Sequence, residues 1–231
     1  MLYIVATPIG NLDDITLRAL NTLFTVDVVF CEDTRKTLNL LRLSQKTGQV
    51  IPKLVSYFEE NEFKRIPEIV SELEKGTKMA LVTNSGTPTI SDPGFKLVRE
   101  CRQRNIPVIS IPGPSSPIAA LACSGLPTDK FLFLGFLPNK SGQRVKLFEN
   151  VKESQKSVSS TIIFFESPFR ITKSLLDLKI VFGDIDIVIC RELTKIHEET
   201  QQNKISFFVE RFSNQQPKGE FVILFNVAKK G

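Results

Sequence analysis

Short hydrophobic runs alternate with segments of helical periodicity along the first half of the chain. Near-continuous hydrophobicity is typical of strands buried on both faces of a sheet. The runs that predict strands cover residues 2–6, 26–31, 53–57, 78–83 and 108–111. Amphipathic segments predict helices over residues 17–24, 34–43, 61–75 and 95–104, the first capped by Asp13 or Asp14. This half therefore predicts a mostly parallel α/β sheet with helices on both faces.

The second half has a different pattern. Predicted strands cover residues 131–136, 161–165, 185–190 and 220–226, and predicted helices cover residues 115–123, 140–153, 170–182 and 205–212. No element is predicted for the polar residues 191–204. Gly125 and Pro127 interrupt the pattern, so we expect an N-terminal α/β subdomain over residues 1–125 and a C-terminal α/β subdomain with a mixed sheet over residues 126–231.

Composition narrows the class of protein. The 231 residues are 42% hydrophobic and 24% charged, which excludes disorder or a coiled coil as a description of the whole chain. The four cysteines form no CxxC pair and His197 is the one histidine, so no metal site is expected. We expect a cytoplasmic protein, because neither a signal peptide nor a membrane span is evident. The net charge of +5 permits a polyanionic partner without requiring one.

The loops after the predicted strands are the expected place for chemistry, because ligands of parallel sheets bind beyond the carboxyl ends of strands. GxGxxG, GxxxxGK[ST] and GxSxG motifs are absent, which disfavours nicotinamide enzymes, P-loop NTPases and α/β-hydrolases. Instead, residues 7–11, 84–94 and 112–116 are rich in proline and glycine. Each loop alone is compatible with a tight turn, whereas together they favour a ligand cleft.

Several motifs carry a resemblance to a known family. The run 6–20 (ATPIGNLDDITLRAL) is followed in order by EDTR at 32–35, GTPTISDPG at 86–94, IPGPS at 111–115, GFLP at 135–138 and RELTK at 191–195. Residues 166–168 (ESP) match more weakly. In these motifs the chain resembles the tetrapyrrole methylase-like methyltransferases, specifically their ribosomal RNA-modifying branch. The resemblance implies S-adenosylmethionine (SAM) in a cleft between two subdomains, a homodimer, and 2′-O-methylation of a cytidine ribose in the decoding region of 16S rRNA within the small ribosomal subunit.

The same resemblance implies the cofactor residues. They are Pro8, Gly10, Asn84, Ser85, Gly86, Ser115, Ser116, Phe165, Glu166, Gly219 and Glu220. Two positions depart from the family pattern: Asn84 stands where the family has an acid, and Phe169 stands where it has histidine. Asn84 keeps an acceptor oxygen but removes a charge that would face the sulfonium of SAM.

Methyl transfer from a sulfonium needs a group that positions the acceptor hydroxyl and takes its proton. The candidates for catalysis are Glu32, Glu192 and Lys195, with Asp33 and Glu166 as further carboxylates. Around Glu32 the competing interpretation is a helix cap at Asp33 or Thr34. For phosphate contacts we expect Arg35, Arg144, Lys146, Arg170 and Arg191. The basic segment 139–156 has a solvated helix as its alternative, and the phenylalanines are expected in the core.

Two other functions remain open at this point. One is methylation of a small tetrapyrrole or corrinoid precursor on the same scaffold. The other is an inactive SAM- or RNA-binding homologue, suggested by Asn84 and Phe169. The long motifs at 6–20 and 86–94 favour the ribosomal RNA methyltransferase.

Overall fold

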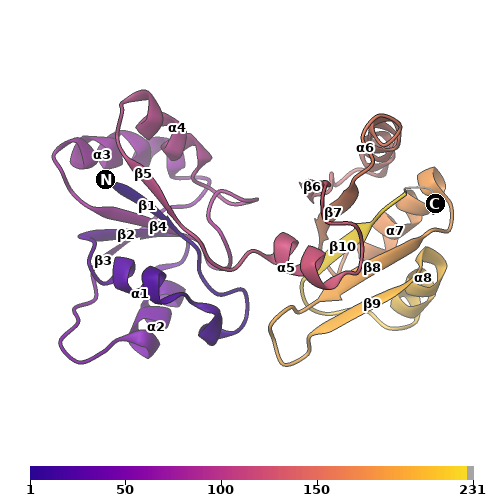
Figure 1. Cartoon of the computed structure of the whole chain (residues 1–231), viewed down its shortest axis with the longest axis horizontal. Coiled ribbons are helices and arrows are strands. Elements are labelled where there is room, and N and C mark those ends of the chain that lie inside the picture. Colours follow the sequence, from indigo (N-terminus) through magenta and orange to yellow (C-terminus); the bar gives the residue numbers. More distant parts are fainter. Residues whose placement is uncertain (228–231) are drawn as a thin grey trace. The chain divides into compact units, whose positions relative to one another are not determined.

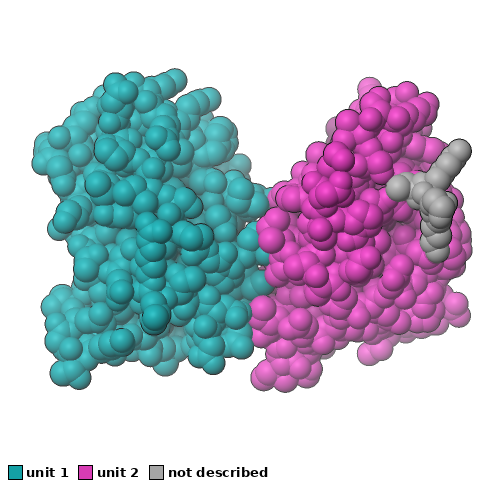
Figure 2. Space-filling view, in the orientation of Figure 1, with its two compact units in different colours: residues 1–115 teal, residues 116–231 magenta. Residues whose placement is uncertain are grey.

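The computed structural model describes residues 1–227. The chain divides into two units between Ser115 and Ser116, here called the N-terminal and C-terminal units (Figures 1 and 2). The division falls ten residues before the predicted boundary, for a reason given below.

The N-terminal unit is built on a parallel sheet. Its strands are β1 (Leu2–Val5), β2 (Val28–Cys31), β3 (Lys53–Ser56), β4 (Met79–Val82) and β5 (Val108–Ile111), in the order β3-β2-β4-β1-β5. All four strand pairings are parallel. The helices are α1 (Leu17–Leu23), α2 (Thr34–Ser44), α3 (Glu62–Glu74) and α4 (Phe95–Gln103), with a 3₁₀ turn at Leu12–Asp14.

Alternate strand residues supply two separate cores, because successive side chains point to opposite faces of a sheet. Leu2, Ile4 and Leu81 pack with α3 and α4. Val5 and Val82 pack with α1 and α2 on the other face. Figure 1 shows these helix pairs on opposite sides of the sheet. The predicted fold of this half is confirmed.

The C-terminal unit has a mixed sheet, also as predicted. Its strands are β6 (Phe131–Phe136), β7 (Thr161–Glu166), β8 (Asp186–Arg191), β9 (Glu199–Lys204) and β10 (Phe221–Phe225), in the order β6-β7-β10-β8-β9. Only β6 and β7 are parallel among these pairs. The helices are α5 (Ser116–Cys123), α6 (Ser141–Ser154), α7 (Ile171–Phe182) and α8 (Ile205–Asn214).

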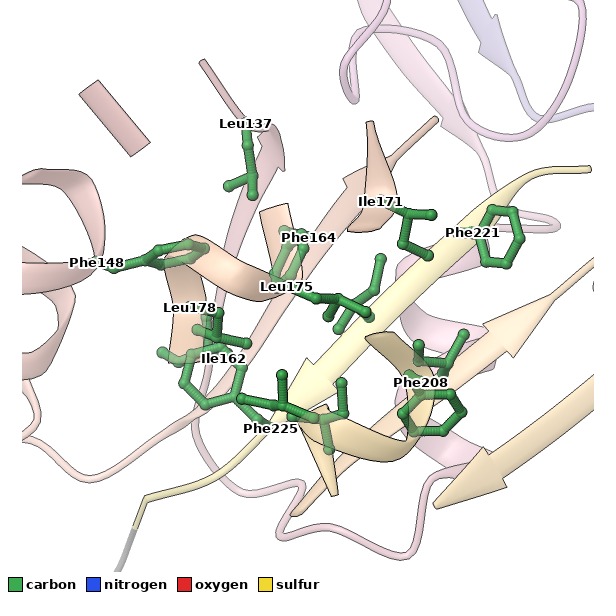
Figure 3. Close-up of a cluster of buried hydrophobic side chains, with 14 of the residues drawn as sticks. Leu137, Phe148, Ile162, Phe164, Ile171, Leu175, Leu178, Phe208, Phe221 and Phe225 are labelled. Atoms are coloured by element: carbon green, nitrogen blue, oxygen red, sulfur yellow. The ribbon is translucent and has the colours of Figure 1, made fainter. Parts of the chain in front are cut away.

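One face of this sheet packs against α6, α7 and α8 around a cluster rich in phenylalanine, which includes Phe148, Phe164, Phe208 and Phe225 (Figure 3). Helix α5 packs on β10 and β7. Buried α5 side chains such as Ala120 and Leu121 thereby join this unit. Packing of α5 on this sheet is why the division lies before α5 and not after it.

Two local predictions are wrong. The N-cap of α1 is Thr16, whose hydroxyl accepts a hydrogen bond from the Ala19 amide at 3.1 Å. Neither Asp13 nor Asp14 caps this helix. Strand β9 was not predicted, because its sequence, ETQQNK, has no hydrophobic alternation. It forms at the sheet edge by antiparallel pairing with β8.

Candidate active site

Three loops of the N-terminal unit meet at the carboxyl ends of neighbouring strands β4, β1 and β5. Thr7 and Gly86 exchange two backbone hydrogen bonds of 2.9 and 3.0 Å, and the Thr7 hydroxyl donates to the Thr83 carbonyl at 3.1 Å. The Thr87 hydroxyl donates to the Pro114 carbonyl at 2.9 Å. The strand order therefore brings together the three proline- and glycine-rich loops, as predicted from their position after strands.

Two glycines in these loops are restricted for different reasons, Gly113 by the close approach of Ala6 and Gly86 by its positive φ. A Cβ at Gly113 would lie 3.0 Å from the Ala6 Cβ, and one at Gly86, where φ is +84°, would lie 3.4 Å from Ile9. The loop after β4 also holds Thr89 and Ser91 at φ of 76° and 60°. Non-glycine residues in this region are strained, and such strain concentrates at functional sites.

Asn84 provides the observation that fits a ligand at these loops. Its Oδ1 is buried and has no hydrogen-bond partner within the described residues 1–227. A buried acceptor without a donor carries a desolvation cost of about 1–3 kcal/mol, which a bound donor would remove. SAM has ammonium and hydroxyl donors, so the donor set fits. Of the other predicted contacts here, Pro8 and Ser115 are half-buried, whereas Gly10 and Ser85 are exposed.

Two carboxylates flank Thr83 at the same edge of the sheet. The Thr83 hydroxyl donates to Glu32 Oε2 at 3.4 Å. Burial, together with the Glu32 charge, raises the pKa of Asp92 to about 6, and the single Thr83 hydroxyl proton opposes this rise when it is donated to Asp92 in place of Glu32. Asp92 was not among the predicted catalytic residues. The Ser91-Asp92-Pro93 run after Ile90 marks this carboxylate in the sequence, but the sequence does not show that a carboxylate in a loop is buried.

A buried glutamate fixes the loop that carries Asp92. Glu62 is 2% exposed and accepts from the Tyr57 hydroxyl at 2.8 Å, from the Gly94 amide at 3.0 Å and from Lys96 at 2.9 Å. Burial opposes its charge, but these donors hold the pKa of Glu62 below its usual range. Gly94 allows the close approach, because at φ +126° a Cβ would meet Leu81 at 2.5 Å.

Glu192 and Lys195 are brought together in the C-terminal unit. Glu192 Oε1 accepts from Lys195 Nζ at 2.8 Å and from the Glu220 amide at 3.0 Å, and Lys195 also pairs with the Glu220 carboxylate at 2.9 Å. The Lys195 hydrogen bond lowers the pKa of Glu192. Partial burial disfavours the Lys195 charge, yet its two carboxylate partners raise its pKa. Lys195 is thus a cation at neutral pH and not the deprotonated amine that a general base requires.

Gly219 allows the backbone before Glu220 to lie close against the Glu192 side chain. Its φ is +101°, and a Cβ there would lie 2.5 Å from Glu192 Cγ. Glu192 and Thr194 have positive φ as well, at 51° and 66°. The predicted contacts Gly219 and Glu220 therefore lie beside the predicted catalytic pair within this unit.

Glu166 and Arg170 stabilise their own unit. Glu166 is 1% exposed and accepts from the Ser174 hydroxyl at 2.5 Å and the Ser167 amide at 2.8 Å. Arg170 pairs with Glu166 at 2.9 Å and donates to the Leu137 carbonyl at 2.7 Å. Both side chains are engaged with protein groups. Nearby, Phe165 packs on Phe133 and Phe136 with ring centroids 4.9 and 5.3 Å away.

The prediction that Arg144 faces RNA is wrong. Arg144 is 3% exposed and lies 2.6 Å from the Asp177 carboxylate. It also donates to the carbonyls of Pro138 and Asn139 at 3.1 and 2.8 Å. Its place on α6 is on the face that packs against α7, so the guanidinium joins the two helices.

The other predicted cations differ in exposure. Arg35 is 89% exposed and pairs with Asp33 at 2.8 Å, and Asp33 also caps α2 through the Arg35 amide, which was the competing interpretation. Lys146 is exposed, and no ion pair involves it within residues 1–227. Arg191 is 27% exposed and pairs with Glu199 at 3.3 Å. Arg35 and Lys146 are thus the most exposed of the five, and of these two Lys146 makes no ion pair within residues 1–227.

Neither a membrane span nor a metal centre is found in the described part of the chain. No helix within residues 1–227 has both the length and the apolar character to cross a bilayer. In that same range, no group of three or more His, Cys, Asp and Glu side chains is arranged to hold a metal ion.

The fold of this chain, an all-parallel unit followed by a mixed unit, is shared with solved methyltransferases. The chain matches the methyltransferase CobJ with a TM-score of 0.70 and 16% identity, over 100% of this chain and 95% of that one. It matches uroporphyrin-III C-methyltransferase from Thermus thermophilus, complexed with S-adenosylhomocysteine, with a TM-score of 0.64 and 16% identity over 96% of each chain. At this identity the likeness shows the fold.

The chain belongs to the tetrapyrrole (corrin/porphyrin) methylases, whose family match covers residues 1–207. Among its relatives, the ribosomal RNA small subunit methyltransferase I of Thermotoga maritima is 43% identical over 97% of both chains. The protein of that name from Rickettsia prowazekii is also 43% identical, over 97% of this chain and 78% of its own length. The family predicted from the motifs is confirmed.

Proposed function

We propose that this protein methylates the 2′-hydroxyl of a cytidine ribose in 16S rRNA of the small ribosomal subunit, in the cytoplasm. The observation that carries the proposal is the 43% identity, over 97% of both chains, to a ribosomal RNA small subunit methyltransferase I. The solved corrin and porphyrin methyltransferases are only 16–17% identical, so they give no comparable support for a small macrocyclic substrate.

SAM is the methyl donor of this reaction, and when bound it supplies a methyl group on a sulfonium that leaves as a neutral thioether. Asn84 and the backbone of the loops after β1, β4 and β5 would hold it in the N-terminal unit. The ribose oxygen forms the new C–O bond and loses its proton. Asp92, with its pKa of about 6, is the proposed acceptor of that proton, and the nearby Glu32 charge contributes to the raised pKa.

The engaged residues of the C-terminal unit have a different role in this proposal. Glu192 has a lowered pKa and Lys195 a raised one, so neither matches the proton-transfer task at neutral pH. Their mutual pairing with Glu220 holds the loop that contains Gly219 in one conformation. We assign them to positioning this loop.

The decisive experiment is transfer of a tritiated methyl group from SAM. The acceptors are small subunits lacking the modification, naked 16S rRNA and a corrinoid precursor, each with EDTA present. Label in 16S rRNA, mapped to a ribose by nuclease digestion, supports the proposal. Label only in the corrinoid supports the macrocycle alternative, and SAM binding without transfer to any acceptor supports the inactive homologue.

We also propose a homodimer formed through β6. This strand is an edge of its sheet and exposes Phe131, Leu132 and Phe136 by 45%, 38% and 60%. An exposed hydrophobic edge strand offers unpaired backbone groups to another strand, and a second copy brings an identical one.

A further inference from the structure

Two phenylalanine rings of the N-terminal unit lie largely in solvent. Phe63 on α3 is 72% exposed and Phe95 at the start of α4 is 56% exposed. From the sequence both were expected in the core. Large apolar side chains that gather on a surface mark interaction sites more often than isolated ones do.

Cations lie over both rings. Lys96 Nζ is 4.1 Å from the Phe63 ring centroid and 5.7 Å from that of Phe95, and Arg99 Cζ is 5.9 Å from the Phe95 centroid. Lys96 is held there by buried Glu62 at 2.9 Å. Glu62 therefore holds the Lys96 ammonium beside the Phe63 ring.

A groove opens between α3 and α4, and of the two rings Phe63 lines it. Its volume is about 240 Å³, and Phe63, Ile66, Pro67, Lys96, Arg99 and Arg104 contribute to its lining. Pockets that enclose a drug-sized ligand measure roughly 300–1,000 Å³. This smaller, partly apolar groove suits one planar ring, with charged groups at its rim.

Charge selects the class of occupant. The groove is lined by three cations, Lys96, Arg99 and Arg104, and one acid, Glu100. Lys96 pairs with Glu62, and Arg104 pairs with Glu74 and Glu100. Within the described residues Arg99 makes no ion pair, so it is the lining cation left for an external anion. A planar ring next to an anion is the chemistry of a nucleotide, and aromatic platforms beside basic residues are how proteins bind unstacked bases.

We infer that the groove between α3 and α4 binds single-stranded RNA, with a base against Phe63, the adjoining phosphate at Arg99, and Phe95 flanking the groove as a secondary contact. This inference rests on the ribosomal RNA substrate proposed above and adds a contact surface outside the methyl-transfer site. An acidic peptide is the competing occupant, but it offers no planar base to the rings.

The test uses fluorescence anisotropy with a labelled single-stranded RNA of about 12 nucleotides and a duplex of the same sequence. We expect Phe63→Ala to weaken single-strand binding about tenfold, the scale of one stacking contact, and Phe95→Ala to weaken it by a smaller factor. Phe63→Tyr keeps the ring and should retain binding. Arg99→Ala should lower the slope of log affinity against log salt by about 0.7.

The matched control is Arg42→Ala with Leu43→Ala on α2, which removes an exposed cation and a 63% exposed apolar side chain from the same unit. This variant should bind like the natural protein. Four outcomes would each overturn the inference. They are equal binding of the single strand by all variants, equal affinity for the duplex, no binding of single strands, and preference for an acidic peptide. Methyl transfer to small subunits by the natural protein is measured separately, and its absence refutes the proposed function. RNA binding that does not depend on the rings, in a protein that still transfers methyl groups, refutes only the proposed RNA site in the groove.

Discussion

Replacing Arg144 by methionine should destabilise the C-terminal unit and should not act through RNA contacts. Methionine keeps much of the aliphatic volume and removes the guanidinium. Asp177 then remains 5% exposed, and within the described residues its remaining hydrogen-bond donor is the Ser141 hydroxyl at 2.8 Å, while the carbonyls of Pro138 and Asn139 lose their donor. Breaking a buried pair by removing one partner costs about 3–5 kcal/mol. We expect a loss of that size in the free energy of unfolding.

The assay must measure the stability of the C-terminal unit. Both tyrosines, Tyr3 and Tyr57, lie in the N-terminal unit and the chain has no tryptophan, so intrinsic fluorescence reports the wrong half. Native-state hydrogen exchange of α6 and α7 amides measures the C-terminal unit directly. Lys146→Met on the same helix is the matched control, because Lys146 is exposed, and it should change stability by less than about 0.5 kcal/mol.

A double variant separates the pair from general damage to the helix. Arg144→Met with Asp177→Leu removes both charges, and well-packed apolar replacements of buried pairs are often neutral. Most of the stability should return. The burial argument would be refuted if Arg144→Met left hydrogen exchange in α6 and α7 unchanged and reduced the salt dependence of small-subunit binding. That result would indicate that Arg144 contacts RNA.

Three further outcomes are expected. Burial raises the folded-state pKa of Asp92 from 3.8 to about 6, so the ionised carboxylate destabilises the folded protein above that pH. Asp92→Asn should therefore add about 1 kcal/mol of stability at pH 8, after allowance for solvent screening, and nothing below pH 4, as denaturation measured across pH would show. The same variant should abolish pH-dependent methyl transfer. Asn84→Asp should tighten SAM more than S-adenosylhomocysteine in calorimetry, since only SAM has the sulfonium charge, and equal changes would contradict a nearby sulfonium. Sedimentation of Phe136→Glu at micromolar concentration should give a monomer where the natural chain gives a dimer, and an unchanged dimer would exclude β6 as the interface.

Much of the fold could be predicted from the sequence because hydrophobic spacing follows local geometry. Leu2 to Val5 alternate between two cores, and this is visible as a continuous hydrophobic run. The loops at Thr7, Gly86 and Pro114 could be predicted to meet, since parallel neighbouring strands end at one edge. Strand β9 could not, because an edge strand forms through backbone pairing and its side chains need no pattern.

The sequence by itself determined the order of the elements other than β9, the presence of a parallel and a mixed sheet, and the family motifs. Tertiary structure alone decided which side chains are available for chemistry. Arg144 and Lys146 stand two residues apart on α6, yet only Arg144 faces α7 and is buried, and Phe63 lies in solvent where a core position was expected. Asp92 takes its raised pKa from burial and from Glu32, which is sixty residues away in the chain. Burial and charge proximity depend on the elements that pack against a residue, and those neighbours are distant in sequence.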